Sequence, residues 1–172
     1  MKVVYFFQTL KIVFIFTVLV LFSRTFLIEP GVVNGMSMEK TFIDEEVFLI
    51  NKITLLLREP KRYDMVQFFD KDSDELIIKR VIGLPGEQVY IKKNSIFIID
   101  KHGIETKLNE PYLSQYMVTR TKDGAVKYDI LEPNKYFLLG DNRVSSTDSR
   151  TTGPIHRKYI LGTISKLPFK KN

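Results

Sequence analysis

Beyond residue 25, the apolar residues of this chain come in short runs separated by clusters of Pro, Gly, Asn and Asp. Several runs alternate apolar with polar residues, as strands do when successive side chains point to opposite faces of a sheet. The separating clusters are typical of turns. The pattern predicts a mostly β fold, with strands at residues 25–28, 46–50, 65–69, 76–82, 88–91, 95–99, 128–131, 136–139 and 159–165.

Two segments follow this pattern less closely. Residues 53–58 are rich in Ile and Leu and suit a short helix, a strand or a lipid-facing loop. Residues 101–127 are polar and contain tyrosines, so we expect an insertion of hairpins or loops there. The length of 172 residues, 44% of them hydrophobic, suits one domain of ordinary size plus one membrane element.

An apolar stretch precedes the predicted strands. Residues 4–22 form a run of 19 residues, interrupted by Gln8 and Lys11, which is close to the roughly 20 residues that cross a bilayer core. A span over residues 12–28 is the alternative, with 17 residues and Arg24 reaching the outer interface. We interpret residues 1–24 as a cytoplasmic tip and a single transmembrane anchor, and residues 25–172 as a β-rich domain.

A cleavable signal peptide also begins with basic residues and an apolar core. No small-x-small cleavage site follows this core, because residues 21–26 are bulky and Ala125 is the only alanine of the chain. We therefore expect the segment to be retained. Lys2 and Lys11 favour a cytoplasmic N-terminus and an extracytoplasmic β domain, whereas Arg24 counts the other way.

The composition excludes several kinds of site. Without Cys, the chain has no disulfide, thiol nucleophile or thiolate metal site, and His102 and His156 are too few for a histidine-rich centre, so we expect no metal. The net charge of +6 is dispersed along the chain, which favours a surface near anionic lipid over a nucleic-acid site. Any nucleophile must therefore be Ser, Thr, Lys or a carboxylate.

Lys79 interrupts the apolar run of residues 76–82. In a strand it shares one face with Ile77 and Val81 while Arg80 lies on the other, so we expect one of the two cations to be buried. Burial lowers the pKa of an ammonium group, and a neutral amine can act as a general base. From this run alone, a lysine that reaches solvent from an edge strand is the alternative.

Three further segments combine polar groups with turn residues. Ser37 follows Gly35 and lies between two methionines, where it can be a nucleophile or a plain loop serine. Residues 61–68 form the charged start of a predicted strand. Residues 140–150 are dense in hydrogen-bonding groups, and their Asp and Arg side chains can pair to fix the loop against the core.

In this order, the segments resemble the type I (leader) signal peptidases, membrane-bound Ser/Lys proteases, and most closely their single-span Gram-positive members. The resemblance covers essentially the whole chain, and the ordered set is far more specific than any one motif. The nucleophile box is matched by Gly35-Met36-Ser37-Met38-Glu39-Lys40-Thr41, the second box by Arg62-Tyr63-Asp64, the lysine box by residues 79–86, and the last box by residues 140–150.

The resemblance implies a β-rich domain resting on the membrane, with its active site on the extracytoplasmic side. Ser37 would be the nucleophile and Lys79 its general base, with no metal or cofactor. The substrates implied are secretory preproteins with small-x-small cleavage sites. The resemblance also assigns supporting roles: Ser146 orients the lysine amine, Asp148 and Arg150 form an ion pair, and Asp141, Asn142 and Arg143 form the scaffold around it. For the substrate, it implies that the pockets for small side chains are lined by Val33, Met38 and Ile78.

The backbone N–H of Ser37 is the natural first donor to the oxyanion of the reaction. Gram-negative relatives supply a second donor from a serine at the position of Gly35, so the second donor is open here. Two positions depart from the family pattern: Lys40 replaces a proline, which removes a fixed φ, and Tyr63 replaces a glycine.

Two other functions stay open at this stage. One is a secretion or pilus-assembly factor on the same scaffold, either non-catalytic or narrowly dedicated. The other is a self-cleaving repressor-type Ser/Lys protease, which the N-terminal anchor and the lack of a DNA-binding module disfavour.

Overall fold

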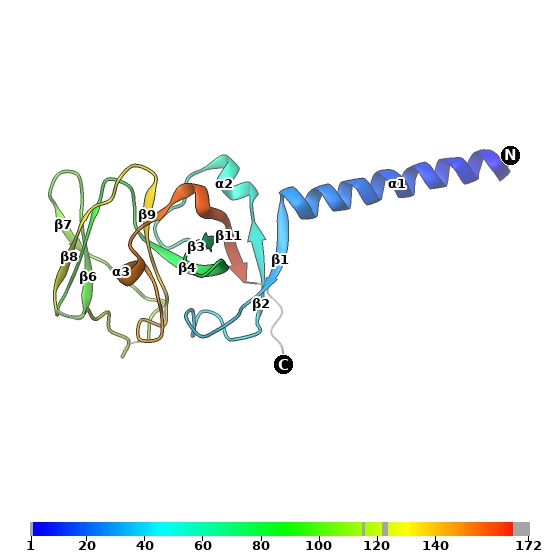
Figure 1. Cartoon of the computed structure of the whole chain (residues 1–172). Helices are drawn as coiled ribbons and strands as arrows, with labels where there is room; N and C mark the ends of the chain where they lie inside the picture. The colour runs from blue at the N-terminus through cyan, green and yellow to red at the C-terminus, as the bar shows by residue number, and fades with distance from the viewer. Residues whose placement is uncertain (1, 115, 122–123, 167–172) are drawn as a thin grey trace.

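The chain begins with a long helix that projects away from a β domain (Figure 1). The structure, a computed structural model, describes residues 2–114, 116–121 and 124–166. Helix α1 spans Lys2–Phe26, and its segment Tyr5–Phe22 has a mean hydropathy of 2.0 and is not buried against the protein. This helix is long and apolar enough to cross a membrane, which fits the expected anchor.

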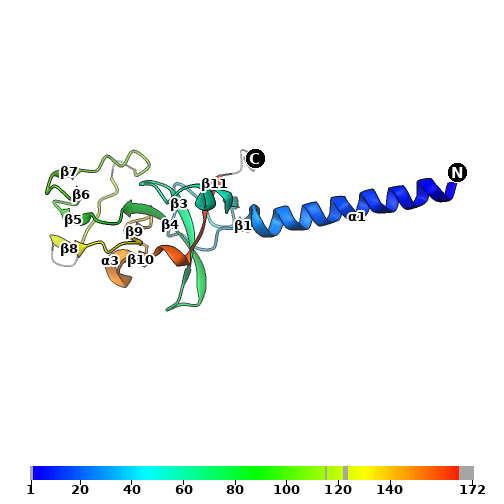
Figure 2. The ribbon, with the colours of Figure 1, turned by 90° about the horizontal axis from the view of Figure 1, so that it is seen from above.

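The β domain consists of two antiparallel sheets, which lie at different distances from α1 (Figures 1 and 2). The larger sheet has the strand order β1-β2-β11-β3-β4-β9-β10 and comprises β1 (Ile28–Val32), β2 (Val47–Asn51), β3 (Met65–Asp70), β4 (Glu75–Gly83), β9 (Lys135–Leu139), β10 (Ile155–His156) and β11 (Ile160–Lys166). The smaller sheet has the order β7-β6-β5-β8 and comprises β5 (Gln88–Lys92), β6 (Ser95–Ile99), β7 (Glu105–Lys107) and β8 (Val126–Ile130).

The predicted fold class is confirmed, and each predicted strand from residue 46 onward corresponds to an observed strand. The strand predicted at residues 25–28 is wrong, because α1 continues to Phe26 and β1 begins only at Ile28. Short apolar runs do not by themselves separate the last turn of a helix from a strand. The short helices are α2 (Ile53–Leu57), α3 (Ser149–Thr152) and the 3-10 helix η1 (Arg157–Tyr159).

Strand β4 runs through the middle of the larger sheet, between β3 and β9. Its successive residues reach different core clusters: Val81 packs with Val66 and Leu138, whereas Ile82 packs with Val89 and Phe137 of the smaller sheet's core. Near its middle, Lys79 pairs with Val66 of β3. From Lys79 to Gly83 every residue of β4 is buried, so the polar side chains of this half of the strand are buried on both faces of the sheet.

Candidate active site

Ser37 and Lys79, which are 42 residues apart in the sequence, meet in the structure. The Nζ of Lys79 lies 2.7 Å from the Oγ of Ser37. Ser37 stands in a tight turn after β1, and the next residue, Met38, is buried and accepts backbone hydrogen bonds from Thr41 and Phe42 at 3.1 and 2.8 Å. Met38 therefore anchors the turn in the core, and Ser37 faces Lys79, which comes from β4.

Lys79 is buried, with 3% of its surface exposed, and it forms no ion pair within the described part of the chain. Burial lowers the pKa of its amine from 10.5 to about 8, against the opposing influence of Asp148 and Asp141. At pH 7 roughly one lysine in ten is then neutral. The arrangement places a readily deprotonated amine beside a serine hydroxyl.

The expectation that only one of the two cations of β4 is buried is wrong, since Arg80 is also only 7% exposed. Its guanidinium donates two hydrogen bonds to the carboxylate of Asp141, at 2.8 and 2.6 Å, and one to the carbonyl of Tyr63 at 2.9 Å. The ring of Tyr112 covers it, with 4.0 Å between the guanidinium carbon and the ring centroid. A charge can be buried on this face because its hydrogen bonds are satisfied.

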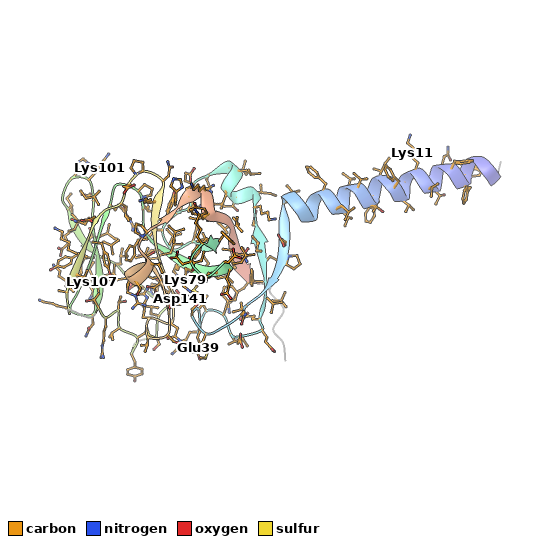
Figure 3. All side chains as sticks on the ribbon, viewed as in Figure 1. Lys11, Glu39, Lys79, Lys101, Lys107 and Asp141 are labelled. Carbon is orange, nitrogen blue, oxygen red and sulfur yellow. The ribbon has the colours of Figure 1, made fainter. Side chains whose placement is uncertain are left out.

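The loop after β9 contacts both sides of the site. Figure 3 labels Asp141 of this loop together with Lys79. Asp141 accepts hydrogen bonds from Arg80 and from the hydroxyl of Thr41, and the backbone N–H of Asn142 donates to the carbonyl of Ser37 at 3.0 Å. The side chain of Asn142 donates to Glu39 at 3.1 Å. These contacts fix the serine turn relative to β4.

Asp148 and Arg150 form the ion pair that the family resemblance implies. The carboxylate of Asp148 accepts from Nε and an Nη of Arg150, both at 2.8 Å, and also from the backbone N–H of Gly140 at 3.1 Å. Asp148 is also the N-cap residue of α3. Asp148 therefore links Gly140, at the start of the loop of residues 140–150, to Arg150 at its end.

Arg143 reaches partners that sequence reasoning missed. Its buried guanidinium donates to Glu110 and to the hydroxyl of Thr119, and its Nε donates to the carbonyl of Gly140 at 3.1 Å. Tyr112 donates its hydroxyl proton to Glu110 at 2.7 Å. Glu110, Tyr112 and Thr119 come from the polar insertion. The one signal for them in the sequence is indirect: an arginine that becomes buried needs a carboxylate partner.

Ser146 does not form the hydrogen bond to Lys79 that the resemblance implies. Its Oγ is buried and has no partner among the residues described. It packs instead against Gly140, where an added Cβ would lie 2.2 Å from the Oγ of Ser146 and 2.6 Å from the carbonyl oxygen of Ser37. Only glycine fits at this point of close approach.

The three residues expected to contact substrate come together beside Ser37. Val33 and Met38 are buried in one core cluster, and Ile78 packs against that cluster. All three line an open cavity of about 570 Å³, together with Ser37 and Lys79. The part of this cavity that Val33, Met38 and Ile78 line is apolar, and it can hold a small apolar side chain beside the hydroxyl and the amine.

Both departures from the family pattern fall at residues with a positive φ, which is 81° at Lys40 and 72° at Tyr63. A proline could not adopt the conformation of Lys40, because its ring holds φ near −65°. At Tyr63 the strain is partly offset by an edge-to-face contact with Tyr112, at 5.8 Å between ring centroids. Tyr63 therefore packs on the same ring that covers Arg80.

Comparisons with known proteins agree on one family. The family profile described as "Signal peptidase, peptidase S26" matches residues 6–168. The chain is 38% identical over 166 residues to Signal peptidase I of Bacillus licheniformis, covering 91% of this chain and 85% of that protein. It is 39% identical over 159 residues to Signal peptidase I P of Bacillus subtilis subsp. natto, covering 89% and 83%.

A solved structure is similar as well. The crystal structure of a signal peptidase I from Enterococcus faecalis V583 aligns with a TM-score of 0.52 and 25% identity, covering 63% of this chain and 98% of that one. The similarity therefore extends from the sequence motifs to the arrangement of the strands.

Proposed function

This chain belongs to the peptidase S26 family of signal peptidases, and on that premise we propose that Ser37 is the nucleophile and Lys79 the general base with which it removes signal peptides from exported preproteins. The observation that supports these roles is the 2.7 Å separation between Nζ and Oγ, at a lysine whose pKa burial lowers to about 8.

The proposed reaction requires only these two side chains and the backbone. A neutral Lys79 accepts the hydroxyl proton as Ser37 attacks the scissile carbonyl, and the resulting ammonium then protonates the leaving amine. The backbone N–H of Ser37 is the proposed donor to the oxyanion. An acyl-enzyme forms on Ser37, and water releases it in the reverse sequence of proton transfers.

The remaining site residues support this chemistry indirectly. Arg80, Asp141 and Asn142 hold the serine turn against β4 through the hydrogen bonds described above. Arg143, Asp148 and Arg150 hold the loop that carries Asp141. We place Ser146 near the site but assign it no contact with Lys79. Whether it orients the lysine amine is tested by the activity of Ser146→Ala.

The proposed substrates are secretory preproteins with small side chains at the first and third positions before the cleaved bond. Val33, Met38 and Ile78 are the residues proposed to contact these side chains. α1 would anchor the enzyme with the β domain on the extracytoplasmic face, where the cleavage sites of exported proteins emerge. The similarity to signal peptidases over most of the chain does not favour a non-catalytic assembly factor.

The test is cleavage of a labelled preprotein by the purified full-length protein in detergent. We expect Ser37→Ala and Lys79→Ala each to abolish processing, and Ser145→Ala to process normally. Ser145 is the matched control because it is an exposed serine of the neighbouring loop. Normal processing by either Ser37→Ala or Lys79→Ala would refute the assignment.

A further inference from the structure

A second open cavity, of about 850 Å³, lies against the loop that carries Ser146. Its walls include Arg120, Thr121, Tyr128, Val144 and Ser146. The reaction proposed above does not use this cavity, although Arg143, Ser146 and Arg150 of its lining also support the site. Its walls come from the polar insertion, β8 and the loop after β9, so it is built from parts of the chain that are distant in sequence.

The cavity adjoins the proposed catalytic serine. Ser146, in its wall, and the carbonyl of Ser37 both approach Gly140 so closely that no Cβ fits there. The next residue, Thr147, lines the cavity beside Ser37 and Lys79. Neighbouring residues of this loop therefore line the two cavities, Thr147 the one beside Ser37 and Ser146 the second one. An extended peptide that lies beside Ser37 and continues along this loop would enter the second cavity.

The lining of the second cavity carries positive charge only. It includes Arg120, Arg143 and Arg150, and no Asp or Glu. Arg143 and Arg150 are paired with Glu110 and Asp148. Arg120 is exposed, and its guanidinium forms no hydrogen bond or ion pair with the residues that the structure describes. An anionic group in the cavity would thus find an uncompensated cation.

Two polar atoms at the cavity also lack partners. The Oγ1 of Thr121 and the Oγ of Ser146 are the buried side-chain oxygens without a hydrogen bond in the described ranges, and both residues belong to the lining. Buried hydroxyls are normally paired with protein or with water. Because both hydroxyls lie at one cavity, a polar ligand there, such as a peptide backbone, would supply the hydrogen bonds that they lack.

We propose that this cavity binds the substrate residues that follow the scissile bond, and that Arg120 favours an acidic side chain among them. The proposal rests on the peptidase function proposed above, and adds to it a preference for the sequence of the mature protein. The rim of the cavity is apolar at Val144 and Tyr116, which are both 83% exposed. Such a rim suits an extended segment that carries apolar as well as acidic residues.

The test uses peptides that are identical up to the cleaved bond and carry Glu, Gln or Lys in turn at the second, third or fourth position after it. With the full-length enzyme in detergent at low salt, we expect kcat/KM to decrease in the order Glu, Gln, Lys at one of these positions. A partly exposed ion pair contributes up to about 1 kcal/mol, so the Glu peptide should exceed the Gln peptide by up to about fivefold. The preference should shrink as salt is added.

The decisive variant is Arg120→Glu, which should reverse the order so that the Lys peptide is cleaved fastest. Lys101→Glu is the matched control: it makes the same change of charge at an exposed lysine that Figure 3 shows away from Lys79 and Asp141. Equal kcat/KM for all three peptides would overturn the proposal, as would an unchanged order in Arg120→Glu or the same reversal in Lys101→Glu. Failure of the wild-type enzyme to cleave any of the peptides would instead refute the peptidase function itself.

Discussion

Replacing Lys79 by methionine should make the folded protein more stable at neutral pH while abolishing its activity. Methionine preserves the length and apolar character of the lysine stem in its buried site but carries no charge. Lys79 is 3% exposed and has no carboxylate within ion-pair distance in the described residues, so the hydrogen bond to Ser37 and the more distant Asp148 and Asp141 offset only part of the desolvation of its ammonium.

The magnitude follows from the pKa of the lysine. A folded pKa of about 8 against 10.5 for the free side chain corresponds to a loss of about 3 kcal/mol in the free energy of unfolding. Because the folded pKa is the lower one, this loss is complete below pH 8, shrinks between pH 8 and 10.5, and vanishes above pH 10.5. The variant also loses the contact with Ser37, which contributes about 1 kcal/mol. We therefore expect Lys79→Met to be about 2 kcal/mol more stable at pH 7.

The measurement is urea unfolding of the full-length protein in detergent, followed by circular dichroism from pH 6 to pH 11. The advantage of Lys79→Met over wild type should disappear at the alkaline end, and titration of tyrosines cancels in this difference because both proteins contain them. Lys101→Met, at an exposed lysine, should show no such pH dependence. A Lys79→Met protein that is less stable than wild type at pH 7, or whose stability difference is constant with pH, would show that the lysine is charged and well solvated in the folded state.

Three further predictions concern the site and its departures from the family pattern. The kcat/KM for preprotein cleavage should rise about tenfold per pH unit up to about pH 8, the pKa of Lys79, and then level off; a profile that is flat from pH 6 to 9 would contradict the base role. At Tyr63, where φ is 72°, thermal unfolding should show Tyr63→Gly to be about 1 kcal/mol more stable than Tyr63→Ala, because both lose the ring but only glycine relieves the strain. Equal stability would remove the strain argument. Gly140→Ala should reduce processing and lower the melting temperature, since its Cβ would collide with the carbonyl of Ser37; a fully active and stable variant would show that the loop moves freely.

The sequence alone was sufficient for the parts of this protein that depend on local pattern. The apolar N-terminal segment indicates a helix long enough to span a membrane, and the alternating runs predict the described strands from residue 46 onward except the short β7 and β10. Both patterns report which faces of a segment are apolar. The ordered motifs around Ser37 and Lys79 indicated the family. The last turn of α1 was missed because four residues carry too little periodicity to distinguish helix from strand.

The tertiary structure decided how the charges are buried and what they contact. Periodicity placed Arg80 on the face opposite Lys79 and predicted one buried cation, yet the loop of Asp141 and the insertion of Tyr112 cover Arg80 as well. Glu110 reaches Arg143 over 33 residues of sequence, and no local pattern encodes such a distance. The conformations of Lys40 and Tyr63 were likewise invisible, because a positive φ at a residue other than glycine is set by its surroundings. Local sequence specifies which segments are strands, whereas the partners of a buried charge are specified only when the segments pack together.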